Sequence, residues 1–115
     1  ELERIRDELG HAMGPHLEFI QSTRLFHLNG NVFFVHAAAD PARPPAAQTP
    51  DVLLWGHEEF PRRQRTDGLW VVHGHVMVEE PVARGGVISI DTGAYVTHRL
   101  TAARLTPGEV RFLVA

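Results

Sequence analysis

The sequence predicts an α+β fold made of a mixed β-sheet and short helices. Two stretches with helical spacing of apolar residues open the chain, and several short apolar runs follow. Turn signals rich in Gly, Pro and Asn separate these runs. The 115 residues, 43% hydrophobic and 22% charged, suit one globular domain over residues 1–115.

The first elements are expected to be helices. Leu2, Ile5 and Leu9 fall on one helical face over residues 1–10, and Gly10 can stop that helix. Pro15 suits the first position of a second short helix. These helices lead directly into the first strand.

The strands are predicted from short apolar runs at 25–28, 32–35, 69–73, 87–90, 100–105 and 110–114. Asn29-Gly30 predicts a tight hairpin between the first two, and Pro107-Gly108 joins the last two. The run 32–35 is apolar at every position, so we expect that strand to be buried on both faces.

A loop and a third helix are expected between the second and third strands. Four prolines between positions 41 and 50 exclude regular structure there. Asp51 is a candidate N-cap for a short helix that reaches Trp55, and Pro61 ends or redirects it.

Composition excludes several classes of protein. The net charge is −3, which does not favour a nucleic-acid partner. No apolar run approaches the ~18 residues of a membrane span, and the charged start "ELERIRDELG" is unlike a secretory signal. The absence of cysteine rules out disulfides and thiolate metal sites and permits a reducing compartment. We therefore expect a cytoplasmic protein with no membrane or nucleic-acid partner.

Histidines follow two of the predicted strands. His36 comes after "VFFV", and His73 and His75 bracket Gly74 after "WVV". Loops diverge at the carboxyl ends of strands and leave a crevice, and an imidazole there can bind a metal. Glycine between the two histidines lets the backbone or a ligand come close. The alternative is that each histidine is a hydrogen-bonded structural residue, and spacing alone leaves both open.

The carboxylates give a weaker signal. Asp91 ends an apolar strand in "ISIDTGAY", where it could be catalytic or could cap the turn with its own side chain. Asp40, before Pro41, suits a turn. The acidic doublets at 58–59 and 79–80 are expected on the solvated surface, because adjacent residues do not face one another.

Several segments together resemble a known family. In order, they are "FFVHAAADPARPPAAQ", "DVLLWGHEEF", "GLWVVHGHVMVEEP" and "VISIDTGAYVTHRLTAARL". From about residue 16 onward they are similar to the C-terminal half of bacterial calcineurin-like metallophosphoesterases, in the branch of serine/threonine protein phosphatases and diadenosine tetraphosphatase-like hydrolases. The resemblance implies the C-terminal half of an αββα sandwich.

The resemblance also implies a metal site. The family binds two divalent metals, commonly manganese, iron or zinc, and its "VHAG" and "GH" motifs supply histidine ligands of the second metal. Those positions are His36 and His75 here, while His73 is not carried over as a ligand. Gly74 would then let the chain turn to present His75. The implied reaction is metal-assisted attack of a water molecule on phosphorus.

The sequence departs from the family pattern in ways that lower the expected activity. The Gly-Asp-x-His, Gly-Asp-x-x-Asp and Asn-His-Glu motifs of the N-terminal half are absent. His57 stands where an arginine commonly grips substrate phosphate, so it is at most a weak phosphate ligand. Ala38 replaces a glycine, and Val76 and Met77 replace a Thr-Pro pair. This chain alone should hold at most one weakly bound metal.

Two functions follow. The chain is a metallophosphoesterase segment that acts on a phosphorylated protein or a small phosphoester once completed, or it is an inactive remnant or binding module that keeps the fold. One half of an αββα sandwich would leave an apolar face of its sheet exposed to solvent. The expected partner is therefore the missing N-terminal half or a second copy of the chain.

Overall fold

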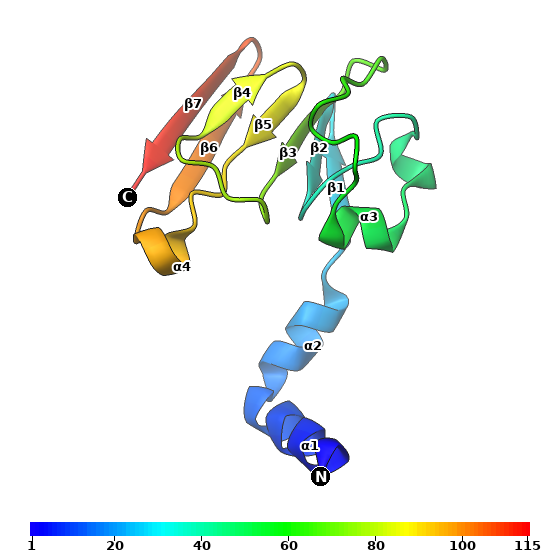
Figure 1. The fold of residues 1–115 in the computed structure, drawn as a ribbon, viewed down its shortest axis with the longest axis vertical. Coiled ribbons are helices and arrows are strands. Elements are labelled where there is room, and N and C mark those ends of the chain that lie inside the picture. Colours follow the sequence, from blue (N-terminus) through cyan, green and yellow to red (C-terminus); the bar gives the residue numbers. More distant parts are fainter.

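The computed structural model describes all 115 residues and confirms an α+β fold with a mixed sheet (Figure 1). The helices are α1 (Leu2–Met13), α2 (Pro15–Ser22), the 3₁₀ helix η1 (Pro45–Ala47), α3 (Pro50–Trp55) and α4 (Ala94–Thr97). The strands are β1 (Phe26–Asn29), β2 (Val32–Val35), β3 (Trp70–His73), β4 (Val82–Arg84), β5 (Val87–Ser89), β6 (Thr101–Thr106) and β7 (Glu109–Val114).

The main sheet has five strands in the order β1-β2-β3-β5-β4. The inner pairs β2–β3 and β3–β5 are parallel, and the outer pairs β1–β2 and β4–β5 are antiparallel. β6 and β7 form a separate two-stranded hairpin beside β4 and β5 (Figure 1). Because β2, β3 and β5 run in one direction, the segments that follow them leave the sheet at the same end.

Both predicted hairpins are confirmed. Gly30 has φ 57°, which supplies a left-handed residue for the turn that pairs Asn29 with Val32. Gly108 has φ 79° in the turn that pairs Thr106 with Glu109. In each case local turn chemistry fixes the register without help from the rest of the fold.

One core cluster lies on the face of the main sheet that α3 covers, while Val72 and Ile88 are buried on the opposite face. Phe33 of β2 and Val71 of β3 are fully buried against Leu53 of α3 and Ala39 of the following loop. The Phe26 ring packs edge-on against Phe33 with centroids 5.2 Å apart. Removing this apolar area from water, at ~25 cal/mol per Å², stabilises the packing of α3 on the sheet.

The prediction that residues 32–35 are buried on both faces is wrong. Phe33 is the one fully buried residue of β2, and its three neighbours in the strand are partly exposed. Phe34 points to the face opposite Phe33 and lies beside the exposed His27 ring of β1, with ring centroids 5.8 Å apart, so this face is not fully covered.

Three helix boundaries differ from the predictions: the end of α1, and the start and the end of α3. α1 continues through Gly10 and ends at Gly14, whose φ of 49° breaks the helix. α3 is capped by Thr49, which accepts a hydrogen bond from the Val52 amide at 3.5 Å, and Asp51 lies inside the first turn. The helix ends at Gly56, before Pro61 is reached.

Three elements were not predicted. The four-proline segment, expected to lack regular structure, contains the 3₁₀ helix η1, because the fixed φ of proline suits the first turn of a helix. β4 has only three residues and forms through its pairing with β5, which the sequence does not show. α4 is a single turn that begins after Gly93, in the segment interpreted above as a turn. The chain contains no helix with the length and apolar composition needed to cross a membrane.

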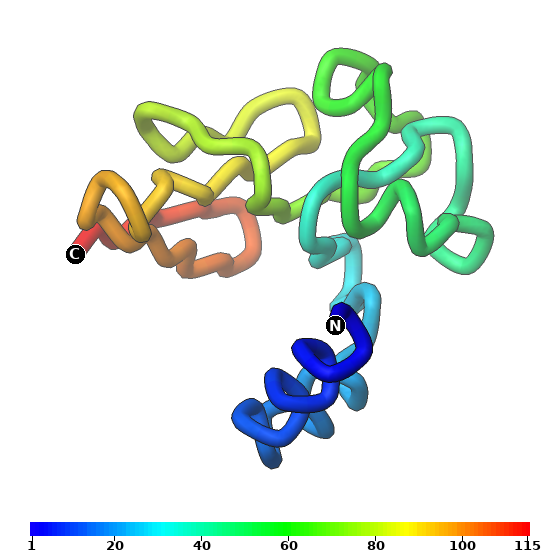
Figure 2. The backbone as a smooth tube through the Cα atoms, turned by 60° about the horizontal axis from the view of Figure 1, so that its bottom comes forward, coloured from blue at the N-terminus to red at the C-terminus, as the bar shows by residue number.

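α1 and α2 extend away from the sheets in both views (Figures 1 and 2). Their apolar side chains remain in solvent: Leu2 is 83% exposed and Phe19 is 69% exposed. Only 14 of 115 residues are buried in the whole chain. A chain of this size with so little buried surface leaves large apolar areas that a further polypeptide could cover.

Arg65 joins two loops that flank the core. Its guanidinium donates to the Asp40 carbonyl at 2.8 Å and to the Arg43 carbonyl at 2.9 Å, and it also pairs with the Asp67 carboxylate. The Arg65 side chain is only 6% exposed. The hydrogen bond from Arg65 holds the pKa of Asp67 below its ordinary value. The loop before α3 is thereby tied to the loop before β3.

We predict that Arg65→Gln lowers the free energy of unfolding by ~1–3 kcal/mol, because it removes the charged hydrogen bonds from a nearly buried guanidinium to two backbone carbonyls. The deficit should shrink under acid, since the pair contributes above the ordinary pKa of Asp67 and is lost as pH falls through its lowered value. Urea unfolding at neutral pH and at about pH 3 checks this. Arg62→Gln is the control, because exposed Arg62 bonds only the Glu58 carbonyl. Equal effects of the two substitutions would contradict the account.

Candidate metal centre

His36 and His75 meet at the edge where the parallel strands end. The Nε2 atom of His36 lies 3.2 Å from the Nδ1 atom of His75, and the ring centroids are 4.9 Å apart. Both residues are exposed, although 39 positions separate them in the sequence. The structure therefore brings together the two histidines predicted as ligands and presents them to solvent.

The backbone explains how the two rings converge. β2 pairs in parallel with β3, so His36 and Gly74 leave neighbouring strands at the same end. The Gly74 amide donates to the His36 carbonyl at 2.9 Å and ties the two exits together. His75, one residue later, then turns its ring back toward His36.

The expectation that Gly74 supplies the turn is not met. Gly74 has no left-handed φ, and a Cβ there would meet Asp91 and the His36 carbonyl at ordinary distances of 3.6 and 3.7 Å. His75 itself adopts the left-handed conformation, with φ 67°. A non-glycine residue in this region is strained by ~1–2 kcal/mol, and such strain concentrates at functional sites.

His73 has a structural role. Its ring is buried, with Nε2 2.7 Å from the Ser89 hydroxyl and Nδ1 3.0 Å from the Gly74 carbonyl. Phe60 packs edge-on against it at 4.8 Å. Burial lowers the pKa of His73 from its ordinary value, mainly because the charged form would be desolvated. His73 and His75 therefore face different environments, since the strand ends between them.

Asp91 caps a turn in the structure. Its Oδ1 atom accepts from the Gly93 amide at 2.9 Å, the bond expected when an aspartate side chain stabilises its own turn. Its carboxylate also lies near Gly74, as the 3.6 Å separation above shows. Asp91 therefore stabilises a turn next to Gly74, close to the ends of the strands that position the histidine pair.

His57 contacts a carboxylate. Its Nε2 atom lies 3.8 Å from Asp40 Oδ2, and its Nδ1 atom accepts from the Glu59 amide at 3.3 Å. Asp40 also pairs with Arg43 and bonds the Ala42 amide, which is the turn role predicted for it. A carboxylate beside His57 would repel a phosphate anion.

One exposed apolar side chain borders the histidine pair. The Trp55 ring lies edge-on to His75 at 6.1 Å and is 69% exposed, a contact that the sequence did not indicate. Met77 is also exposed, and its sulfur lies where a Cβ on Gly93 would come within 2.4 Å. A side chain at Gly93 would displace the flexible Met77 side chain and would also have to adopt the left-handed φ of 68°. Ala38 is buried, so its methyl group is accommodated in the core.

No group of three or more His, Asp or Glu side chains is arranged to hold a metal ion. The candidate centre thus consists of the histidine pair. Comparison with protein-family models, curated proteins and solved structures finds no significant match.

We predict that His75→Gly raises the free energy of unfolding by about 1 kcal/mol, because glycine relieves the left-handed strain. His98 is the matched control, since it is the other non-glycine residue with positive φ, at 59°. His98→Gly should stabilise the chain to a similar extent, as measured by urea unfolding. Only His75→Gly should remove the histidine pair. Destabilisation by His75→Gly alone would show that the pair holds the fold together.

Proposed function

We propose that this chain is a segment of a metal-dependent phosphoester hydrolase of the serine/threonine protein phosphatase type, and that His36 and His75 are two ligands of its second metal. The separation of their nitrogens supports this proposal. Two ligand nitrogens ~2.0–2.1 Å from one tetrahedral zinc ion lie about 3.3 Å apart. The observed 3.2 Å between Nε2 and Nδ1 fits that spacing.

The chemistry of the two side chains also fits. Neutral imidazole is a common ligand of zinc, manganese and iron, and both rings are open to solvent. Across the same 3.2 Å, one imidazole can donate a hydrogen bond to the other. The two nitrogens are therefore already held in place before a cation arrives.

A divalent cation bound here would polarise a phosphoryl oxygen and activate a water molecule. This chain orients the two imidazoles through the Gly74–His36 backbone bond, and the Trp55 ring lies edge-on beside His75. His57 would bind a substrate phosphate only weakly, because the neighbouring Asp40 carboxylate repels an anion at that position. A catalytic metal pair needs further ligands, and we propose that another polypeptide segment supplies them.

That segment is the expected partner. The exposed apolar faces of α1 and α2 and the sparse core are suited to burial by an N-terminal half or by a second copy of the chain. The completed enzyme would act on a phosphorylated protein or a small phosphoester. The exposed Trp55 ring beside His75 favours a substrate with an apolar group beside its phosphate.

The alternative proposal is an inactive remnant or binding module that keeps the fold. Its support is that only two metal-ligating side chains converge. Manganese-dependent hydrolysis of an aryl phosphate, measured after a family N-terminal half is supplied, separates the two proposals. Turnover that His36→Ala abolishes supports the hydrolase, and its absence with metal still bound supports the module.

We predict that the chain binds one Zn²⁺ or Mn²⁺ weakly and that His75→Ala or His36→Ala lowers the affinity at least ~10-fold, because each removes one of two ligands. Isothermal titration calorimetry measures this. His16→Ala is the control, since His16 is exposed on α2. Unchanged titration of the His75→Ala variant would contradict the proposed metal site.

A further inference from the structure

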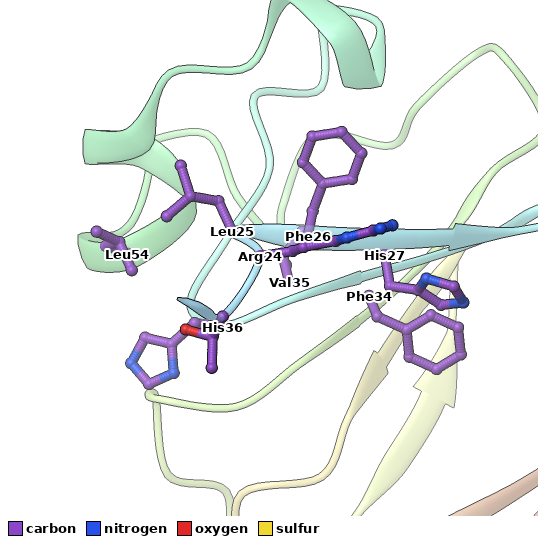
Figure 3. Close-up of a pocket in the computed structure, with 9 residues that line it drawn as sticks. Arg24, Leu25, Phe26, His27, Phe34, Val35, His36 and Leu54 are labelled. Carbon is purple, nitrogen blue, oxygen red and sulfur yellow. The ribbon is translucent and has the colours of Figure 1, made fainter. Parts of the chain in front are cut away.

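A groove of about 490 Å³ begins at His36 and follows β1 (Figure 3). His36 and Leu54 lie at one end of this group of residues, and His27 and Phe34 lie at the other. Residues from both faces of the β1–β2 hairpin line the groove, so it follows the strand edge and does not lie on one face. The groove and the candidate metal centre share His36.

The outer edge of β1 is open. β1 is the terminal strand of the sheet and pairs only with β2, in a continuous register of four residues. It carries no proline, lysine or bulge of the kind that blocks edge pairing. The adjoining Leu25 and Leu28 are 40% and 44% exposed. An extended peptide could therefore gain main-chain hydrogen bonds and apolar contacts along this edge.

The register places the histidine pair at one end of that edge. Phe26 pairs with Val35, the residue before His36, so β1 starts beside the candidate centre and runs away from it. A phosphorylated residue at the histidine pair would leave its neighbours aligned with the four residues of β1. This geometry rests on the proposed function, since it takes the histidine pair as the phosphate end.

The side chains that line the groove favour an acidic peptide. Arg24 and His27 line it, and none of its nine lining residues is acidic. Arg24 takes part in none of the ion pairs of the chain. We propose that an extended, acidic segment of a phosphoprotein substrate adds to the open edge of β1, with Arg24 as a specificity-determining residue.

The test is binding of a fluorescein-labelled seven-residue peptide that alternates leucine and glutamate, followed by fluorescence polarisation without added metal. Alternate amides of a strand point to the same side. Two further peptides carry N-methyl groups on the odd-numbered or on the even-numbered residues. One of them should bind about as well as the parent, and the other should lose roughly 10-fold or more. Equal binding of all three peptides would overturn strand addition.

A second pair of variants tests the charge. Arg24→Glu should weaken the acidic peptide about 5-fold and favour a version with lysine in place of glutamate, as expected for an exposed ion pair. Arg84→Glu is the matched control, because Arg84 is exposed on β4 at the opposite edge of the sheet. Equal effects of the two substitutions would overturn the role of Arg24. Pairing of β1 with a second copy, seen by sedimentation as a dimer that excludes the peptide, would overturn the assigned occupant.

The experiments distinguish a failure of the proposed metal site from a failure of the proposed peptide groove. Binding of the unphosphorylated peptide without metal depends on the groove alone. Adding a terminal phosphoserine should strengthen binding only when Zn²⁺ is present, and His75→Ala should remove that gain. A missing gain with intact peptide binding counts against the metal site, and a missing peptide contact with intact metal binding counts against the groove.

Discussion

The parallel pairing of β2 with β3 is the constraint on which the candidate site depends. It sends two chain segments out of the sheet at the same end, and the Gly74–His36 backbone bond holds those exits together. With the exits fixed, the left-handed conformation of His75 is enough to bring two imidazole nitrogens within 3.2 Å. The fold therefore maintains the pair at the cost of backbone strain at one ligand.

The same arrangement separates a structural histidine from the exposed pair. His73 stays inside, satisfied by Ser89 and the Gly74 carbonyl, while His75 emerges two residues later. A buried, neutral imidazole supports the strand end, and an exposed one remains free to bind. The groove along β1 begins at the second exposed imidazole, His36. In the two proposals, the metal site and the peptide-binding groove therefore lie at the same end of the sheet.

Local signals predicted the elements that form by local chemistry. The Asn29-Gly30 and Pro107-Gly108 turns fixed two hairpins in advance, and the mixed α+β architecture followed from the apolar runs. The sequence could not reveal β4, because its three residues become a strand only against β5. Spacing alone also left the histidine ligands open, since their convergence across 39 residues depends on the strand order. The sequence also did not indicate that His75 itself adopts the left-handed conformation, because glycine is the usual occupant of that region.

Histidine side-chain ¹⁵N spectra recorded during titration with Zn²⁺ show whether His36 and His75 bind one metal ion, because they identify the ligating atom of each ring. The account predicts that the Nε2 signal of His36 and the Nδ1 signal of His75 change together and at one equivalent of metal. Changes at the opposite nitrogens, or at other histidines while these two stay constant, would contradict it.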